Sequence, residues 1–160
     1  VSPLSKVSFI LGKMLPYVVI SLFEFYFILF IGWSMFDIPI PSSAQGGLVL
    51  LSIIYTASMI SMGLLISTVS QTQQQAMFLA IFVIIPSILL AGLIFPIEAM
   101  HQYIKPIAYL IPLTYFVEII RGLLIKQTLM VDLFLSYSAL LGFSVLFTVL
   151  SIIKFKRIGE

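Results

Sequence analysis

The chain has 160 residues, of which 61% are hydrophobic and only 9% are charged, with a formal net charge of +2. Soluble domains carry about 25% charged residues, so this chain cannot cover a water-soluble globule and its main solvent must be lipid. The absence of cysteine excludes disulfides, thiolate metal sites and cysteine nucleophiles. The basic residues form no patch typical of nucleic-acid binding, so no nucleic-acid partner is expected.

Four stretches are apolar enough to form membrane helices, each of which needs about 20 mostly apolar residues. They cover about residues 14–35, 48–69, 77–95 and 133–153. The turn-rich sequence DIPIPSSAQGG separates the first two stretches, and the polar run SQTQQQ separates the second from the third. The sequence therefore predicts an all-α integral membrane protein in the lipid bilayer, with a single transmembrane domain over residues 1–160.

Glu24 is the sharpest single feature of the first stretch. It lies roughly 16 Å along the helix from Lys13, at about 1.5 Å per residue, and so near the middle of the bilayer. An ionisable group at that depth is costly and is by default a functional-site hypothesis. Glu24 is a candidate for binding a cationic substrate or accepting a proton. The alternative is a protonated glutamate in a helix interface, where Tyr17 and Ser21 lie on its face.

Small and hydroxyl residues mark the second stretch. Ser52, Thr56, Gly63 and Ser67 fall near one helix face, where such residues let helices approach closely. Close packing is one interpretation; the other makes Ser52, Thr56 and Ser67 part of a polar substrate pathway. In the third stretch, Pro86 should kink the helix or leave a carbonyl without its donor.

The segment before the last stretch decides the topology. Crossing the membrane would bury charged side chains such as Lys105, at roughly 2.5 to 3.5 kcal/mol each. A fifth span would also move one of the two basic chain ends to the outside, against the preference of positive charge for the cytoplasm. We therefore expect four spans, both ends in the cytoplasm, and residues 96–132 outside or re-entering from outside.

A short helix is expected from Thr114 to Lys126. Thr114, Glu118 and Arg121 recur on one face, where Glu118 and Arg121 could form an ion pair. Val117, Ile120 and Leu124 lie on another face. Pro106 and Pro112 interrupt any longer helix. Two short helical pieces therefore dip into the outer leaflet or lie along it, and an interfacial helix without a transport role is the alternative.

Motifs for catalysis are absent from the sequence. His101 is the only histidine, so it cannot build a metal site with a second one, and no metal is expected. No phosphate-binding loop occurs, so energy from ATP would come from another polypeptide. Three alternatives stay open: an intramembrane enzyme using His101 with Glu98, a non-transporting membrane scaffold, or a proton-coupled carrier using Glu24.

Four pieces in order carry a family resemblance: SPLSKVSFILGKMLPY, STVSQTQQQAMFLA, PSILLAGLIFPIEAM and YLIPLTYFVEIIRGLLIK. The chain resembles the carboxy-terminal part of the ABC-2 type permeases, the membrane subunits of bacterial ATP-binding-cassette exporters, and most of all the multidrug-efflux type. The resemblance implies six spans in the whole permease, of which the last four are here. It fits a chain that begins with Val rather than Met, which we expect to be part of a longer protein.

The resemblance also implies a function and partners. A permease of this family pairs with a second permease, as a homodimer or heterodimer, and docks an ATPase subunit on its cytoplasmic face in the bacterial inner membrane. The partner ATPase would bind ATP and magnesium, so this chain is expected to hold no cofactor and to be no enzyme. The expected activity is export of a hydrophobic or amphiphilic substrate, drug-like or lipid-like.

Site residues follow from the same resemblance. It implies a re-entrant helical hairpin over about residues 96–126, external and before the last span, acting as an outer gate. The gate candidates are Pro96, Glu98, Pro112, Thr114, Tyr115, Glu118 and Arg121. The candidates for contact with the ATPase are Gly12, Lys13, Gln71, Gln73, Gln74 and Gln75.

Overall fold

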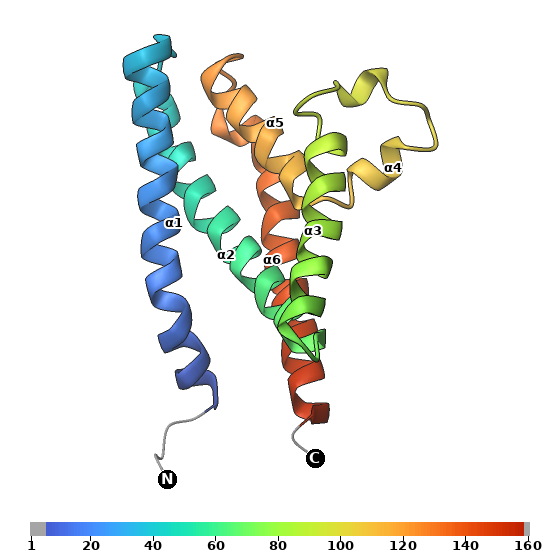
Figure 1. Cartoon of the computed structure of the whole chain (residues 1–160). Coiled ribbons are helices and arrows are strands. Elements are labelled where there is room, and N and C mark those ends of the chain that lie inside the picture. Colours follow the sequence, from blue (N-terminus) through green and yellow to red (C-terminus); the bar gives the residue numbers. More distant parts are fainter. Residues whose placement is uncertain (1–5, 159–160) are drawn as a thin grey trace. The chain divides into compact units, whose positions relative to one another are not determined.

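The computed structural model describes the backbone of residues 6–158 and the side chains of residues 15–154. Over the described residues the chain is helical and contains no strand (Figure 1). The α-helices are α1 (Lys6–Phe36), α2 (Gln45–Val69), α3 (Gln73–Leu90), α4 (Lys105–Ala108), α5 (Pro112–Leu124) and α6 (Phe134–Ile158). Three 3₁₀ turns join them: η1 (Ser42–Ala44), η2 (Ile97–Ala99) and η3 (Met130–Leu133).

Four helical stretches are long and apolar enough to cross a membrane: Leu15–Phe36, Ser42–Val69, Gln73–Leu90 and Met130–Lys154. This confirms the predicted all-α fold with four candidate spans. The third helix begins earlier than predicted because its glutamine run is helical and capped. The Thr72 hydroxyl accepts the backbone N–H of Gln75 at 3.2 Å, which satisfies a donor of the first turn. The helix then ends at Leu90, and Gly92 follows with φ 80.

The chain forms two compact units, residues 1–39 and residues 40–160. The first unit contains α1, whose apolar stretch ends in a left-handed turn. Asp37 has φ 50, and the N–H of Ile38 bonds to the carbonyl of Gly32 at 3.1 Å. This turn satisfies one of the last carbonyls of the helix. Pro39 follows and cannot continue a helix.

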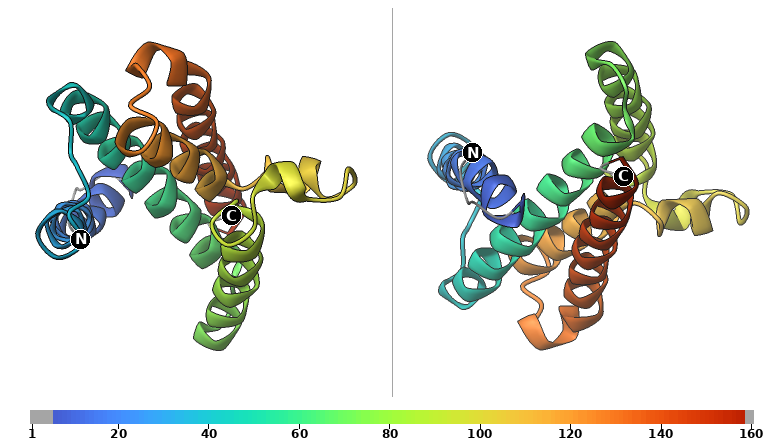
Figure 2. Two further views of the ribbon diagram at one scale, coloured as in Figure 1. Left: turned by 90° about the horizontal axis from the view of Figure 1, so that it is seen from above. Right: turned by 90° about the horizontal axis from the view of Figure 1, so that it is seen from below.

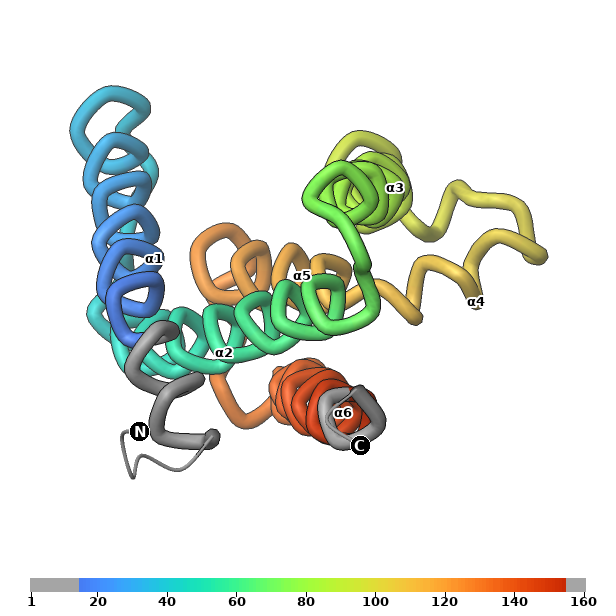
Figure 3. Tube along the Cα trace, turned by 60° about the horizontal axis from the view of Figure 1, so that its bottom comes forward, coloured from blue at the N-terminus to red at the C-terminus, as the bar shows by residue number. Residues whose placement is uncertain are grey.

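The core of the second unit lies where α2, α5 and α6 pack together. Leu51 of α2, Ile119 and Leu123 of α5, and Leu140 of α6 are fully buried there. Figure 3 shows α5 and α6 both running beside α2. Burial of these side chains gives the short helix α5 a fixed place against two long helices.

Among the described residues, polar contacts join α2 to α6 near the beginning of both helices and again beyond their middle. The Tyr137 hydroxyl donates to the carbonyl of Gly47 at 2.9 Å, and the hydroxyls of Ser61 and Thr148 lie 2.9 Å apart in a hydrogen bond. In membranes such contacts contribute roughly 0.6 kcal/mol each, up to about 2. Both helices lack charged residues over their apolar length, so small residues and hydroxyls provide the specific contacts.

Residues 91–133, called here the connecting segment, leave α3 and return to α6 at the same end of the second unit (Figure 1). That end, where α2 and α6 begin, is upper in Figure 1 and is called the upper end; α2 ends and α3 begins at the lower end. Within the segment, α5 rises from the middle of the unit to its upper end. Figure 2 shows the stretch around η2 and α4 projecting sideways from the three packed helices.

Gly47 provides a test of this packing. A Cβ atom at Gly47 would lie 2.9 Å from Leu123 Cδ1 and 3.0 Å from the Tyr137 hydroxyl, whereas one at Gly46 would meet nothing within 4 Å. We expect Gly47→Val to lower the free energy of unfolding by about 1–3 kcal/mol through overpacking. Gly46→Val is the matched control and should change it far less. Thermal unfolding in detergent measures both, and equal losses would contradict the packing described.

Candidate functional site

The turn from α4 into α5 is held by side-chain hydrogen bonds to the backbone. Pro112 occupies the first turn of α5, where its missing N–H is not needed. Thr114, only 2% exposed, donates its hydroxyl hydrogen to the carbonyl of Ala108 at 2.6 Å. The Tyr115 hydroxyl donates to the carbonyl of Tyr109 at 2.9 Å. The Tyr115 bond gives the carbonyl of Tyr109 a partner, and Thr114 adds a second donor to the carbonyl of Ala108, which also accepts the N–H of Ile111.

The environment of Tyr115 keeps its hydroxyl neutral. Burial raises the pKa of Tyr115, and the nearby Glu118 carboxylate and Tyr109 add to the increase. A phenol with a raised pKa remains a hydrogen-bond donor over the whole physiological range. The bond from Tyr115 to Tyr109 is therefore not sensitive to pH near neutrality.

Thr114, Glu118 and Arg121 line one cavity, which confirms the prediction that they share a face of α5. Each of the two charged residues contacts a different helical element. The Ser136 hydroxyl of α6 donates to Glu118 Oε2 at 3.0 Å. Arg121 Nη2 donates to the carbonyl of Leu93, just after α3, at 3.3 Å. Helix α5 is thus connected by polar bonds to the beginning of α6 and to the end of α3.

The predicted ion pair between Glu118 and Arg121 is wrong for this structure: both residues are described, and no ion pair joins them. Helical spacing allows the pair, but each side chain extends toward another element. Sequence spacing within one helix could not reveal these competing partners.

Other faces of α5 are packed. Val117 and Leu124, predicted to share a face, are both buried, and Ile120 is half-buried, although Val117 also borders the cavity. The Phe116 ring lies 4.2 Å from the Tyr55 ring of α2, centre to centre. A Cβ on Gly122 would lie 2.9 Å from Leu133, so α5 and η3 approach closely. The helix is therefore amphipathic, with its apolar side against α2 and α6.

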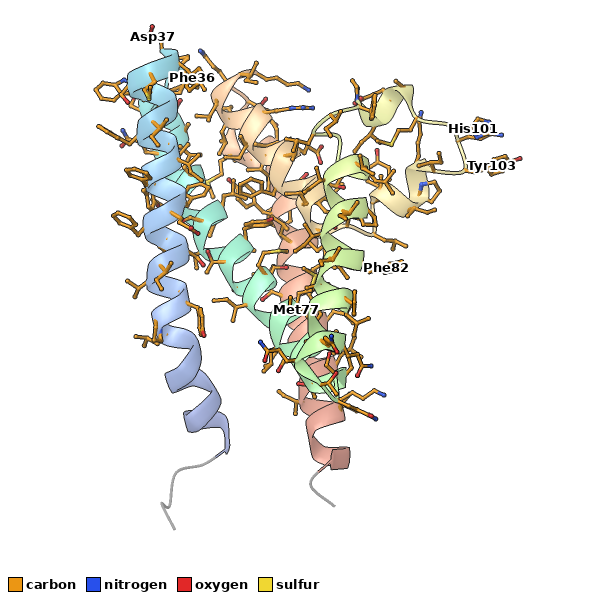
Figure 4. The ribbon with its side chains drawn as sticks, in the orientation of Figure 1. Phe36, Asp37, Met77, Phe82, His101 and Tyr103 are labelled. Carbon is orange, nitrogen blue, oxygen red and sulfur yellow. The ribbon has the colours of Figure 1, made fainter. Side chains whose placement is uncertain are left out.

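The remaining gate candidates and the lone histidine lie outside this packed region. Pro96 precedes η2, and Glu98 lies within it; both are exposed. His101 and Tyr103 occupy the tip of the projecting stretch, with ring centres 5.1 Å apart (Figure 4). The described residues contain no group of three or more side chains able to hold a metal ion.

The pathway candidates are in unlike environments. Glu24 is exposed near the middle of the apolar part of α1. No hydrogen bond joins it to Tyr17 or Ser21, all three being described residues. Ser52 and Thr56 are buried in the second unit, and Ser67 is exposed. Ser52 donates to the carbonyl of Val49 at 2.8 Å. Whether any of them lines a pathway stays a prediction.

Several ATPase-contact candidates have a structural role as well. Gln75 Oε1 accepts the N–H of Gln71 at 2.8 Å, so this pair helps to shape the start of α3. Gln73 and Gln74 are exposed beside them. The side chains of Gly12 and Lys13 lie outside the described residues. The lower end of α3 thus presents a short polar surface. Its contact with an ATPase stays a prediction.

A shallow, open groove runs along one face of α3 from Thr72 to Pro86. Glutamine side chains line its lower end, and apolar residues line the rest, including Phe78, Ile81 and Phe82. Phe82 and Met77 project from α3 and are exposed (Figure 4). This open face of α3 combines a polar end with an apolar wall.

Sequence reasoning missed the partners that hold α5 in place. Ser136 sits in the first turn of α6, where a hydroxyl at the beginning of an apolar stretch is a weak signal. The carbonyl of Leu93 carries no sequence signal at all. Gly47 and Tyr137 are 90 residues apart, and only the folded chain brings them together. Each of these contacts depends on tertiary packing.

Comparison with known proteins gives a consistent result. The family described as "ABC-2 type transporter" matches residues 1–125. The "Probable multidrug ABC transporter permease YbhR" of Escherichia coli K12 is 34% identical over 131 residues, covering 79% of this chain and 34% of that relative. The "Probable multidrug ABC transporter permease YbhS" of the same strain is 30% identical over 158 residues, covering 96% of this chain and 41% of the relative.

A eukaryotic protein is also similar. "ABC transporter G family member 23" of Dictyostelium discoideum is 32% identical over 127 residues, covering 77% of this chain and 17% of that relative. The chain therefore spans well under half the length of these relatives. No solved structure matches it.

Proposed function

Because the chain belongs to the ABC-2 type transporter family, we propose that it forms part of the membrane-spanning permease subunit of an ATP-binding-cassette exporter. The family match over residues 1–125 is the observation that carries this proposal. Four apolar helices without a phosphate-binding loop suit a subunit that provides the membrane path while a partner ATPase hydrolyses ATP. A second permease subunit, identical or different, completes the proposed transporter.

The proposed orientation places the lower end of the second unit in the cytoplasm and the connecting segment outside. Basic residues such as Lys154 follow the last apolar stretch at that lower end, and positive charge in short flanks favours the cytoplasm. The exposed glutamines at the start of α3 would then face the ATPase. The connecting segment would re-enter the outer leaflet, where irregular backbone is tolerated only against protein or a water-filled cavity.

In this orientation α5 acts as the outer gate. It packs against α2 and α6, and its charged side bonds to Ser136 and to the carbonyl of Leu93. A movement of the lower ends of α2 and α6, driven by nucleotide binding to the partner, would therefore shift α5 as well. Closely packed helices have few alternative arrangements, so a shift of α2 and α6 would be passed on to α5.

The proposed substrate is hydrophobic or amphiphilic. Two of the relatives are named probable multidrug permeases, and the groove along α3 joins a polar end to an aromatic and aliphatic wall. Glu24 adds a single negative charge within the apolar part of α1. A carboxylate in that position favours cationic amphiphiles over anionic ones.

Association with an ATPase tests the proposal. We expect the full-length permease, extracted in mild detergent with the ATPase subunit encoded beside it, to co-purify with that ATPase. The rate of ATP hydrolysis by the ATPase should change when the permease is present, because the proposed mechanism couples the movements of the two subunits. The measurements are subunit composition by size-exclusion chromatography and phosphate release. If no ATPase associates and hydrolysis is unaffected, the exporter proposal fails.

Glu24→Gln tests the role of the intramembrane charge. We expect export of cationic substrates by the full-length protein in proteoliposomes to fall at least about tenfold, because an unpaired partner charge is costly in a desolvated site. Export of neutral substrates should stay the same. Asp37→Asn, at the end of the same helix, is the control. Unchanged transport across a series of cations would contradict the role of Glu24.

A further inference from the structure

A small polar cavity lies at the upper end of the second unit, between the turn after α3, η2 and α5. Its volume is about 130 Å³, and its lining includes four charged side chains, two of each sign: Glu98, Glu118, Arg121 and Lys126. These four represent a large part of the charge in a chain that is only 9% charged. Charged side chains that only keep a surface soluble would be spread over it, whereas these four surround one cavity. Their grouping therefore suggests a binding site.

The four charged side chains are not paired with one another. All four are described residues, and no ion pair joins any two of them. Ser136 fixes one oxygen of Glu118, and the carbonyl of Leu93 binds one nitrogen of Arg121. A carboxylate has about four acceptor positions and a guanidinium five donors, so both groups keep capacity for further bonds. Glu118 and Arg121 are therefore each bound to a neutral partner rather than to each other, while Glu98 and Lys126 are exposed.

The charge pattern selects a ligand that carries both signs. An anion alone would meet two carboxylates, and a cation alone would meet two basic groups. A primary ammonium can donate three hydrogen bonds to carboxylates, and a phosphate accepts paired hydrogen bonds from arginine. The cavity is smaller than the roughly 300 Å³ at which drug-sized pockets begin, so it suits a headgroup rather than a whole amphiphile.

The chain next to the cavity carries exposed apolar side chains, called here the rim. Leu93, Ile94 and Phe95 follow its lining residue Gly92 and are 52%, 54% and 60% exposed. Exposed aliphatic and aromatic side chains beside a charged cavity offer contacts for acyl chains. A soluble zwitterion would gain nothing from this rim, whereas a lipid would bury it.

We propose that this cavity binds the phosphoethanolamine headgroup of a membrane lipid, with the ammonium toward Glu118 and Glu98 and the phosphate toward Arg121 and Lys126. The site goes beyond the proposed export activity, since binding requires neither nucleotide nor an ATPase. A trimethylammonium headgroup has no N–H to donate, and a glycerol headgroup has no positive charge. The cavity therefore discriminates among lipids of equal chain length.

Native mass spectrometry of the full-length permease, titrated with dioleoyl lipids, tests the proposal. The ethanolamine lipid should bind at least about tenfold more tightly than the choline or glycerol lipid, as charge-assisted hydrogen bonds imply. Glu118→Gln and Arg121→Gln should abolish this preference. Asp132→Asn, a charged neighbour in η3 that does not line the cavity, should keep it. Lys126→Gln changes an exposed side chain that folding does not need, and it should weaken the preference.

Three results would overturn the proposal. The first is equal binding of the three lipids by the unaltered protein. The second is a preference that survives Glu118→Gln, Arg121→Gln and Lys126→Gln alike. The third is soluble glycerophosphoethanolamine binding as tightly as the lipid, which would make the site one for a soluble zwitterion. A requirement for more than about tenfold higher concentrations of the soluble compound supports the lipid, because acyl chains add apolar contacts.

Discussion

The requirement that backbone polar groups find partners inside lipid governs this structure. No water is available in the hydrocarbon core, so the chain crosses it only as continuous helix. Helices α2, α3 and α6 meet that requirement without a charged side chain over their apolar lengths. The connecting segment is not continuous helix. At the break between α4 and α5, the hydroxyls of Thr114 and Tyr115 donate to the carbonyls of Ala108 and Tyr109.

Specific polar contacts then join the long helices to one another and hold the connecting segment in place. Tyr137 bonds to Gly47, Ser136 to Glu118, and Arg121 to the carbonyl of Leu93. Lipid tails are as apolar as leucine, so apolar contacts alone give little preference for one helix arrangement over another. The Tyr137–Gly47 bond joins α6 to α2, and the bonds of Glu118 and Arg121 join α5 to the start of α6 and to the turn after α3. Glu118 and Arg121 are thus each bound to a neutral partner and keep capacity for the proposed ligand.

Much of this could be predicted from the sequence, and the limits have physical causes. Apolar length and composition identify the four long helices, because membrane thickness sets the number of residues. Helical spacing correctly placed Thr114, Glu118 and Arg121 on one face. It failed for the Glu118–Arg121 pair, because the competing partners Ser136 and Leu93 come from other elements.

The start of α3 was predicted too late. The glutamine run is polar and looks like a loop, yet Thr72 caps it as a helix. The roles of Glu24, Ser52, Thr56 and Ser67 stay predictions.

The central claim is that residues 91–133 enter and leave the membrane on one side, and cysteine labelling measures it most directly. The chain has no cysteine, so single cysteines can be placed at Gln102, before α4, and at Gln127, after α5, in an otherwise cysteine-free full-length protein. A membrane-impermeant maleimide applied to intact cells should label both positions, and should label a cysteine at Gln74 only after the membrane is opened. Labelling of Gln102 and Gln127 from opposite sides would mean that α5 crosses the membrane, and would contradict the account.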